Sequence, residues 1–559
     1  MTRTTAALLS AALLSVPGSV RAQLIGDVAT NNYSNIQPGM PNYGIAEGSI
    51  FSLAGTNDMT ESTASQEVPL QTTLAGVTIA IAVGGVTTLA IPYFVSPGQI
   101  TAILPSKTPV GTGTVTVISG GNSVSSPITV VQSAFGLATV APAVGLTGPW
   151  AAAIAQNDNE GGELLSQANA ANPGEYLTLW GSGVGPVSGD ETQYQIPTDL
   201  TNIPIEVDIG GVSAPVTYHG RSIYPGVDQI NIIVPAGVSG CNVSVVVTAA
   251  GVPSNFATIP VATAGRICAD PGLLSLSSGE YQNLLSFTNV NVGALSLQTL
   301  TMTTPGTAAG ATDSAYATFQ TYTAQQFAFT SFLQVPSVGS CLVTGYLSQP
   351  PLADSSALGQ LNAGPQIILN GPDGSLTLPR YAQSGSYPET SGTSPPIVPQ
   401  GGGTFTFDNG AGGADVGAFK ATLSESITTP LLWTNIADIT AVDRAKGQLI
   451  TWTGGMAGNY VYIFGYSSVY RAAPVAAGYV PYSMYFTCSA PLSAGQFTVP
   501  AAVLETLPAT GTVAYDGLPP SGNGYLYVAS GSIQPFTAPG LNLGLFFFGA
   551  GSGISVPFN

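Results

Sequence analysis

The residues that could carry out chemistry are few in this chain of 559 residues. Its single histidine, His219, stands beside Arg221 in VTYHGRSIYPG, with no cluster of carboxylates around it. A Ser-His-Asp triad would have to use this histidine, and one histidine cannot build a zinc or iron site of the usual kind. The sequence contains no GxSxG nucleophile elbow and no GxxxxGK[ST] or GxGxxG nucleotide loop. We therefore expect a protein that is not an enzyme and uses no cofactor.

Glycoside hydrolysis is the enzymatic alternative, because it needs only a pair of carboxylates. The C-terminal half offers Asp408, Asp415, Asp438 and Asp443. Nothing in their spacing marks two of them as a pair. The alternative function is thus a carbohydrate-active enzyme that would use paired carboxylates in this half of the chain.

Two acidic, glycine-rich loops could offer oxygen ligands to calcium. They are QNDNEGGE (156–163), with Asp158, and DNGAGGAD (408–415), with Asp408 and Asp415. Neither matches the spacing of an EF-hand loop. Solvated turns built from Asn, Asp and Gly are the favoured interpretation, and the three aspartates are weak calcium candidates.

The stretch GNYVYIFGYSSVY (458–470) concentrates aromatic residues. In a strand, alternate residues point to one face, so the tyrosines and Phe464 would share a face. An exposed face of this kind could stack on sugar rings and bond to their hydroxyls, whereas a covered face would belong to a sandwich core, which we favour. Two nearby tryptophans could join either arrangement. The candidate ligand-binding residues are Tyr460, Tyr462, Tyr466, Tyr470, Trp433 and Trp452.

Composition indicates which elements must position these residues. Only 7% of the residues are charged, and 28 acidic against 10 basic residues give a net charge of −18. Such a chain repels phosphate backbones, so nucleic acid is not an expected partner. Hydrophobic residues make up 44%, helix-surface residues are scarce, and 69 Gly and 43 Pro punctuate the chain. This balance predicts an all-β protein.

An internal repeat gives the architecture of the first half. VSPGQITAILP (95–105) recurs as IYPGVDQINIIVP (223–235), and GSIFSLAG (48–55) recurs as GEYLTLWG (174–181). Hairpins with glycine turns accompany both copies. Each copy supplies about six or seven short strands, the pattern of an immunoglobulin-like β-sandwich. The Pro-Gly turn is an architectural feature, since proline fixes one turn angle and glycine permits the next.

The combination of EGSIFSLAGTN, VSPGQITAILP, NPGEYLTLWGSGVGP, VTYHGRSIYPGVDQINIIVPAGV and VPSNFATIPV resembles the Solibacter-type repeat domain. That domain is common in secreted proteins of acidobacteria and is related to the IPT/TIG immunoglobulin-like fold. The resemblance covers about residues 27–262. It implies extracellular β-sandwich modules and brings no catalytic residues with it. The first copy has GTNDM where the second has GSGVG (181–185), so a role of that loop need not be shared.

The remaining sequence predicts one or two further β domains, and it resembles C-terminal regions that accompany the same repeats in exported proteins of acidobacteria. A stretch rich in Ser, Pro and Gly (381–403) predicts a long exposed loop, and VPAAVLETLPA (499–509) is the best helix candidate. The predicted organisation is a signal peptide over 1–22, sandwich repeats over 23–135 and 136–264, a β-rich region over 265–400 and a C-terminal β domain over 401–559.

The N-terminus predicts export. Arg3, an apolar run and small residues up to Ala22 are typical of a cleaved signal peptide. The expected location is extracellular or at the cell surface, with the periplasm as the alternative. An even number of cysteines in an exported protein indicates disulfides, and four cysteines allow three connectivities. The favoured pairs are Cys241–Cys268 and Cys341–Cys488, because each stays within one predicted domain or at its edge.

These observations favour a secreted or surface-displayed protein of tandem β-sandwiches with a structural, adhesive or ligand-binding role. The repeats would be spacers or adhesion modules, and 265–559 would carry any binding specificity. The expected partner is a polysaccharide or another surface protein. Besides the carbohydrate-active enzyme, an outer-membrane β-barrel is a second alternative, which Pro-bounded strands and the lack of two tyrosine girdles argue against.

Overall fold

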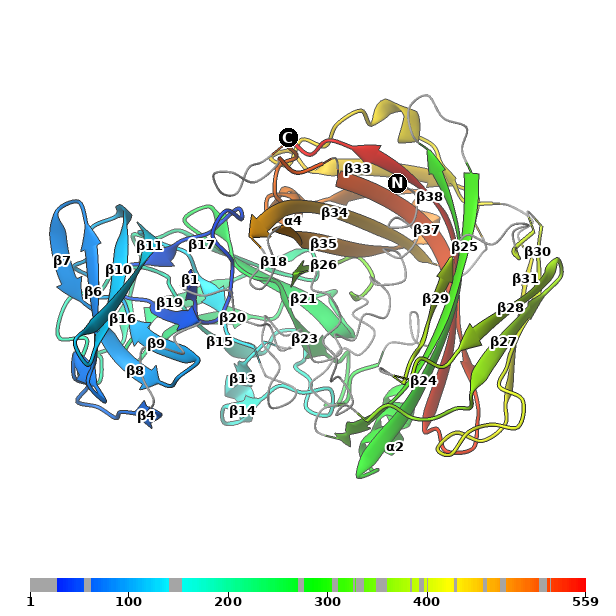
Figure 1. Ribbon diagram of the computed structural model, residues 1–559, viewed down its shortest axis with the longest axis horizontal. Helices are drawn as coiled ribbons and strands as arrows, with labels where there is room; N and C mark the ends of the chain where they lie inside the picture. The colour runs from blue at the N-terminus through cyan, green and yellow to red at the C-terminus, as the bar shows by residue number, and fades with distance from the viewer. Residues whose placement is uncertain are drawn as a thin grey trace.

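The computed structural model describes residues 28–54, 62–139, 153–269, 276–303, 310–324, 327, 336–347, 359–382, 385–391, 397–399, 401–426, 430–455, 460–472, 479–511, 520–522 and 524–559. The expected signal peptide and the loop GTNDM (55–59) lie outside these residues. Within them strands predominate, with the short α-helices α2 (Ser278–Leu285) and α4 (Ala501–Leu504) and the 3-10 helices η1 (Asp158–Glu160), η2 (Ile436–Asp438) and η3 (Leu492–Ala494), which confirms the all-β fold class. Figure 1 shows the repeats at one end and the C-terminal half at the other.

Repeat 1 is a sandwich of two sheets with the orders β1-β3-β9-β8-β4 and β2-β11-β10-β6-β5, β7 pairing with β6. The first sheet contains β1 (Val28–Asn31), β3 (Ile50–Ala54), β9 (Gln99–Ile103), β8 (Ile91–Val95) and β4 (Ala64–Ser65). The second contains β2 (Ile45–Ala46), β11 (Asn122–Val131), β10 (Gly111–Ser119), β6 (Val77–Val83), β5 (Thr73–Leu74) and β7 (Val86–Leu89). Val77, Ile79 and Ile81 of β6 point into the core between the sheets.

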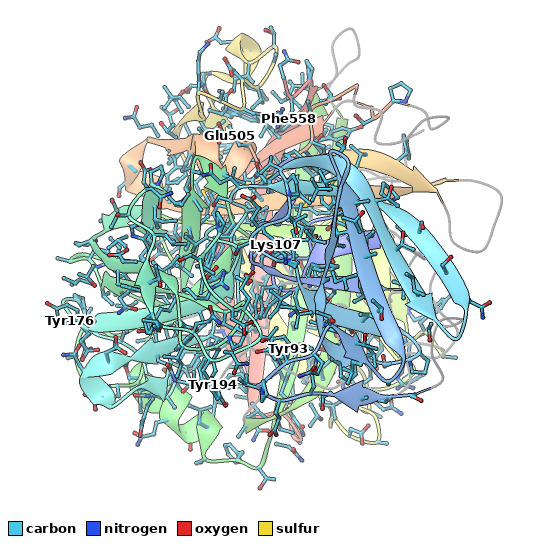
Figure 2. The ribbon with its side chains drawn as sticks, turned by 90° about the vertical axis from the view of Figure 1, so that its left-hand side faces the viewer. Tyr93, Lys107, Tyr176, Tyr194, Glu505 and Phe558 are labelled. Atoms are coloured by element: carbon cyan, nitrogen blue, oxygen red, sulfur yellow. A yellow bond between two sulfur atoms is a disulfide. The ribbon has the colours of Figure 1, made fainter. Side chains whose placement is uncertain are left out.

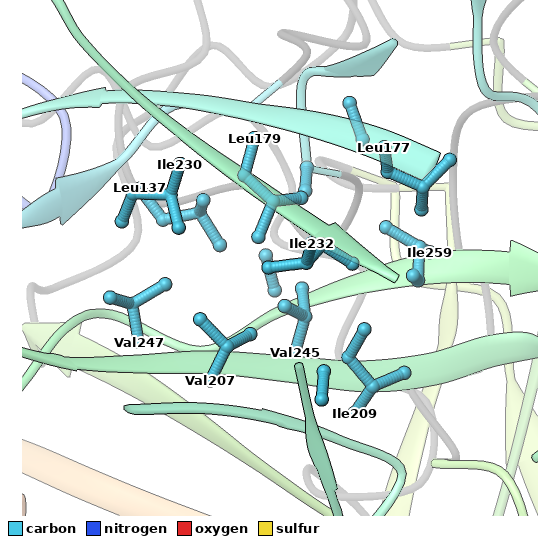
Figure 3. Close-up of a cluster of buried hydrophobic side chains, with 14 of the residues drawn as sticks. Leu137, Leu177, Leu179, Val207, Ile209, Ile230, Ile232, Val245, Val247 and Ile259 are labelled. Atoms are coloured by element: carbon cyan, nitrogen blue, oxygen red, sulfur yellow. The ribbon is translucent and has the colours of Figure 1, made fainter. Parts of the chain in front are cut away.

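Repeat 2 is built in the same way, with the orders β14-β13-β15-β20-β19-β16 and β18-β17-β21-β22, β12 pairing with β15 and β23 with β21. The first sheet contains β12 (Gly136–Leu137), β13 (Ala155–Asn157), β14 (Glu163–Leu164), β15 (Tyr176–Ser182), β16 (Thr198–Asp199), β19 (Val216–Arg221) and β20 (Asp228–Ile233). The second contains β17 (Ile205–Ile209), β18 (Val212–Ala214), β21 (Gly240–Ala249), β22 (Val252–Pro253) and β23 (Ala257–Val261). Figure 3 shows Leu177, Leu179, Ile230 and Ile232 of the first sheet packed against Val207 and other residues of the second.

The two repeats share strand register as well as strand order. Ile50 pairs with Ile103 and Ala54 with Gln99 in repeat 1. At the equivalent positions of repeat 2, Tyr176 pairs with Ile233 and Trp180 with Gln229. The strand pairs β8–β9 of repeat 1 and β19–β20 of repeat 2 each contain a β-bulge at the same position of the ladder. The bulge lies between Pro92 and Phe94 in repeat 1 and between Val216 and Tyr218 in repeat 2. The predicted tandem immunoglobulin-like sandwiches are therefore confirmed.

The C-terminal half is organised by one eight-stranded sheet with the order β26-β35-β34-β37-β38-β24-β25-β29. Its strands are β24 (Asn289–Thr303), β25 (Gly310–Thr323), β26 (Cys341–Leu347), β29 (Tyr387–Ser391), β34 (Tyr460–Ala472), β35 (Tyr479–Pro491), β37 (Gly524–Phe536) and β38 (Leu543–Val556). All neighbours are antiparallel except β24 and β38, which are parallel. The sheet bends strongly, as Figure 1 shows for β34 and β37 against β24 and β25.

Two smaller sheets cover one face of this sheet. The sheet β28-β27-β30-β31 packs on Phe546 and Phe548, and the sheet β32-β33-β36 with α4 packs on Ile554 and Val556. Their strands are β27 (Gln366–Gly371), β28 (Gly374–Pro379), β30 (Gly402–Asp408), β31 (Lys420–Ser426), β32 (Leu432–Trp433), β33 (Gln448–Thr453) and β36 (Gln496–Val499). β27 and β28 form a hairpin. The expected long exposed loop over 381–403 is wrong, since it contains β29 of the large sheet and the buried residues Tyr387, Ile397 and Val398. The helix expected over 499–509 is the shorter α4, whereas α2, which opens with the capping box Ser277–Glu280, was not predicted.

The predicted division between 265–400 and 401–559 needs correction. The eight-stranded sheet takes β24, β25, β26 and β29 from the first range and β34, β35, β37 and β38 from the second. A domain boundary cannot run through hydrogen-bonded neighbours of one sheet. The physical reason is the parallel pairing of β24 with β38, which joins the start of the C-terminal half to its end and forms a single unit.

Both favoured disulfides are present. Cys241–Cys268 links β21 to the segment that leaves repeat 2, and Cys341–Cys488 joins directly opposed residues of β26 and β35. Among the described residues no cysteine is free. Repeat 2 also packs on the C-terminal sheet through Val246 and Phe256, and Ser337 N donates to Asn242 O at 3.0 Å. These contacts fix repeat 2 against the C-terminal half.

A buried ion pair fixes repeat 1 against repeat 2. Arg221 and Asp228, opposite each other on β19 and β20, are 1% and 0% exposed, and Arg221 Nε donates to Asp228 Oδ1 at 2.8 Å. Arg221 Nη2 then crosses the joint and donates to Gly48 O of repeat 1 at 2.9 Å. Since a buried charge must be paired and hydrogen-bonded, this contact specifies how the repeats meet.

The loop GSGVG of repeat 2 holds the carboxylate of this pair. Gly183 N and Val184 N donate to Asp228 Oδ2 at 2.7 and 2.9 Å. Gly183 has φ +110°, and a Cβ there would lie 2.4 Å from Ala134 O, so only glycine fits. The loop therefore helps to bind the buried carboxylate of Asp228 in repeat 2.

We predict that Arg221→Met destabilises the repeats by about 3–5 kcal/mol, because it leaves Asp228 buried without its cation. Urea unfolding of the full chain measures this loss. The matched control is Lys446→Met, which removes an ion pair of a lysine that is 80% exposed and should leave the unfolding midpoint unchanged. Equal midpoints for the two variants would contradict the proposed importance of the joint.

Candidate functional site

The aromatic stretch 460–470 forms most of β34, in the interior of the eight-stranded sheet between β35 and β37. Tyr462 and Phe464 are 5% and 4% exposed on one face, and Val461 and Ile463 are fully buried on the other. The strand is thus covered on both faces along this part. Tyr462 is a core residue, and Tyr460 packs at the edge of the same cluster.

Farther along β34 the tyrosine face is only half-buried, and here Tyr466 lies between tyrosines of both neighbouring strands. Tyr466 pairs with Tyr485 of β35 and with Tyr525 of β37. The Tyr466 ring lies 5.4 Å from that of Tyr485 at 18°, and 5.3 Å from that of Tyr525 at 3°. The three rings therefore stack side by side across three neighbouring strands.

This row continues over five strands. Thr344 of β26 pairs with Tyr485, and Ser555 of β38 pairs with Tyr525. All five residues are half-buried, and all carry a hydroxyl. At a strand spacing of about 4.8 Å the row is about 19 Å long. We call it the hydroxyl row: Thr344, Tyr485, Tyr466, Tyr525 and Ser555.

A buried tyrosine adjoins the row on the same face of the sheet, two residues along β37 from Tyr525. Tyr527 is 2% exposed, and its ring lies 6.1 Å from that of Tyr525. It lies over Gly553 of β38, where a Cβ would come within 2.5 Å of the Tyr527 ring, so glycine is required there. The Tyr527 hydroxyl has no hydrogen-bond partner in the part of the chain that the structure describes.

Burial and neighbouring phenols keep Tyr466 and Tyr527 neutral. Burial raises the pKa of Tyr466, and the neighbouring Tyr525, Tyr485 and Tyr470 raise it further. Burial also raises the pKa of Tyr527. At neutral pH these phenols are therefore both donors and acceptors of hydrogen bonds, and the row carries no charge.

The other sequence candidates are placed differently. Tyr470 lies on β34 beyond Tyr466 and is half-buried. Trp433 and Trp452 pair with each other across β32 and β33, are 2% and 3% exposed, and belong to the core on the opposite face of the sheet. The tryptophans therefore do not join the tyrosines.

Sequence reasoning missed Tyr485, Tyr525, Thr344 and Ser555. Strand alternation within YVPYSMYFT (479–487) and GYLYVAS (524–530) identifies further tyrosine faces, but not which strand each one neighbours. That information comes only from the sheet order.

The calcium candidates have other partners. Asp158 accepts from Thr178 Oγ1 at 3.0 Å, and Asp408 forms an ion pair with Lys420 at 2.9 Å. Asp415 accepts from Asn362 N at 2.7 Å. The described ranges contain no group of three His, Cys, Asp or Glu residues that could hold a metal ion.

The carboxylates of the C-terminal half are similarly dispersed. Asp443 forms an ion pair with Lys446 at 2.7 Å, and Asp438 ends the 3-10 helix η2 (Ile436–Asp438) with its side chain exposed. Asp408 and Asp415 have the partners given above. His219 Nε2 lies 3.1 Å from Leu200 O, and its Nδ1 lies 3.9 Å from Asp199.

Comparison with known proteins gives no family. No protein-family model matches the sequence, and no curated protein matches it. Among solved structures, the chain is similar to SGBP-B from a xyloglucan utilization locus of Bacteroides uniformis, with 11% identity over 84% of this chain and 99% of that chain and a TM-score of 0.16. It is also similar to the FN1–FN3 domains of chicken CNTN1, with 9% identity over 68% of this chain and 96% of that chain and a TM-score of 0.14. The titin Ig tandem A164–A165 is a third (9% identity, 43% and 98%, TM-score 0.12). TM-scores this low carry no argument about function. No helix within the described residues is long and apolar enough to cross a membrane.

We predict that Tyr527→Phe raises the free energy of unfolding at pH 7 by about 1 kcal/mol, because it removes a buried hydroxyl without a partner. Burial raises the pKa of Tyr527 in the folded protein above the unfolded value of about 10. The stability that this difference contributes is complete below pH 10 and is lost as the pH rises toward the folded-state pKa. The variant should therefore also lose less stability above pH 10. Chemical unfolding from pH 7 to 11 measures both effects.

The matched control is Tyr387→Phe. The buried Tyr387 hydroxyl accepts from Ala363 N at 3.1 Å and donates to Gly364 O at 2.7 Å, so this variant should lose about 1 kcal/mol or more. A loss of similar size in Tyr527→Phe would show that its hydroxyl is paired.

Proposed function

We propose that the protein is exported, has no catalytic activity and binds a polysaccharide along the hydroxyl row. The observation that carries this proposal is the alignment of five half-buried hydroxyl residues across five adjacent strands. Such a row offers many neutral hydrogen-bond donors and acceptors in one line, which suits a long ligand rich in hydroxyls. Its length of about 19 Å exceeds that of a single sugar ring.

The absence of charge in the row supports a neutral ligand. The chain has a net charge of −18, so an acidic polymer would be repelled by the protein as a whole. Tyrosine suits such a surface because stacking holds its ring rigidly and its hydroxyl can both donate and accept a hydrogen bond. The three stacked rings therefore present preorganised hydroxyls, which reduces the entropy lost on binding.

Export is supported by two disulfides, which persist in oxidising compartments. The proposed location is extracellular or at the cell surface. A non-catalytic role is supported by the partners of the aspartates, which are lysines, hydroxyls and backbone amides. The resemblance of the repeats to the Solibacter-type domain fits a display role for the first half of the chain.

We predict that Tyr466→Phe combined with Tyr525→Phe weakens polysaccharide binding by about fivefold to a hundredfold. The rings and their stacking remain, and only two hydroxyls, worth about 0.5–1.5 kcal/mol each, are lost. The measurement is retention of the full chain on insoluble cellulose, chitin and xylan, and calorimetric titration with soluble glucan and mannan.

The control is Tyr462→Phe, on the same strand but 5% exposed, which should bind as the wild type does. Binding that survives the double substitution unchanged would exclude the hydroxyl row as the binding site. Binding of none of these polysaccharides by the wild-type chain would move the proposal to a protein partner.

A further inference from the structure

The outer face of the first sheet of repeat 2 carries exposed aromatic rings and side-chain amides that neither the hydroxyl row nor the core uses. On β15, Leu177 and Leu179 point into the core, so Tyr176, Thr178 and Trp180 point outward. Tyr176 is 48% exposed and projects from the margin of the molecule in Figure 2. Tyr224, 46% exposed, approaches from the Pro-Gly turn.

The Trp180 indole is held in a fixed orientation. Its Nε1 donates to Gln156 Oε1 of β13 at 2.9 Å. The ring of Tyr224 lies 6.4 Å away and is tilted by 57°, so the two rings form an open angle. In contrast to the stacked rings of the hydroxyl row, tilted rings leave part of their faces available for contact with another molecule.

Polar groups lie directly beside these rings. Thr178 Oγ1 lies 3.0 Å from Asp158 Oδ2, to which it donates, and 3.1 Å from Asn231 Oδ1, which Gln229 Nε2 approaches at 3.4 Å. The amide nitrogens of Asn231 and Gln156 make no hydrogen bond to another described residue, and both side chains are half-buried. The face thus combines rigid rings with oriented amides that have free donors.

Repeat 1 shows what this face becomes when protein covers it. The position of Tyr176 is occupied there by Ile50, and that of Ile233 by Ile103, and these isoleucines are 5% and 0% exposed against repeat 2. A Cβ on Gly226 of the repeat 2 turn would come within 2.7 Å of Ile50. Repeat 1 also has Ala54 in place of Trp180 and Thr101 in place of Asn231.

The equivalent rung therefore carries two isoleucines where it docks on protein and Tyr176 opposite Ile233 where it does not, whereas Trp180 and Asn231 have no aromatic or amide counterpart in repeat 1. Tyr176 and Trp180 are four residues apart on one strand, about 13 Å along it. This spacing exceeds one sugar ring, so a ligand that contacts both must be a chain of several sugars.

We propose that the outer face of repeat 2 is a second polysaccharide-binding site, in which Trp180 and Tyr224 contact sugar rings and Gln156 and Asn231 donate to sugar hydroxyls. Its ligand is a neutral polysaccharide, since the surrounding chain is strongly acidic. The site is separate from the hydroxyl row and does not depend on it.

The test uses three forms of the full chain. Trp180→Ala and Asn231→Thr each introduce the residue that repeat 1 carries at the same rung, so strand pairing is compatible with both. Tyr381→Ala, which removes a tyrosine that is 54% exposed beyond β28, is the control for loss of any surface ring. Affinity for soluble glucan, mannan and xylan is measured by titration, together with the total tryptophan fluorescence, to which Trp180 contributes as one of four tryptophans.

We expect Trp180→Ala to weaken binding at least about tenfold and to abolish the ligand-induced change in fluorescence. Asn231→Thr should weaken it less, and Tyr381→Ala not at all. Unchanged affinity in Trp180→Ala, or no binding by the wild-type chain, would overturn the proposal. A result in which Trp180→Ala retains affinity and Tyr466→Phe/Tyr525→Phe loses it would reject this site alone, and the reverse result would reject the hydroxyl row alone.

Discussion

The parallel pairing of β24 with β38 is the constraint on which the C-terminal half depends. Residues from Val292 to Thr303 pair in register with residues from Leu543 to Ile554, near the two ends of this half of the chain. One side of the sheet, β25 and β29, is connected to the other side, β37, β34, β35 and β26, only through this pair. The bent sheet and its two covering layers therefore exist as one unit because the last strand returns to the first.

This constraint also determines where the tyrosines face. Once β38 is fixed beside β24, the antiparallel partners β37 and β34 place Tyr525 and Tyr466 in one row with Ser555. The small residues of β38 matter here, since Gly553 leaves room for the buried Tyr527 ring. That ring packs beside Tyr525 on the same face of β37, so the row adjoins a closely packed buried ring at one side.

Sequence reasoning succeeded where a pattern was local or repeated. The alignment of GSIFSLAG with GEYLTLWG predicted equivalent strands, and Cys241–Cys268 was placed because it lies at the edge of repeat 2. Cys341–Cys488 was also paired correctly, although it crosses the predicted boundary at 400/401. Sequence reasoning was wrong about that boundary, since no local pattern reveals that β24 pairs with β38. The outer face of repeat 2 was missed for a different reason. GEYLTLWG does alternate Tyr, Thr and Trp, but their exposure depends on repeat 1 docking elsewhere, through Arg221 and Asp228.

The two proposed binding surfaces belong to parts that are held together rigidly. Cys241–Cys268, Val246 and Phe256 fix repeat 2 on the C-terminal half, so the distance between Trp180 and Tyr466 does not vary freely. A polymer long enough to reach both surfaces would bind the second at a high effective concentration, whereas an oligosaccharide confined to one surface would gain nothing. Affinity should therefore rise steeply once the ligand spans both. This dependence of affinity on the length of the ligand requires no further contact between ligand and protein. It follows from the fixed distance between the two surfaces.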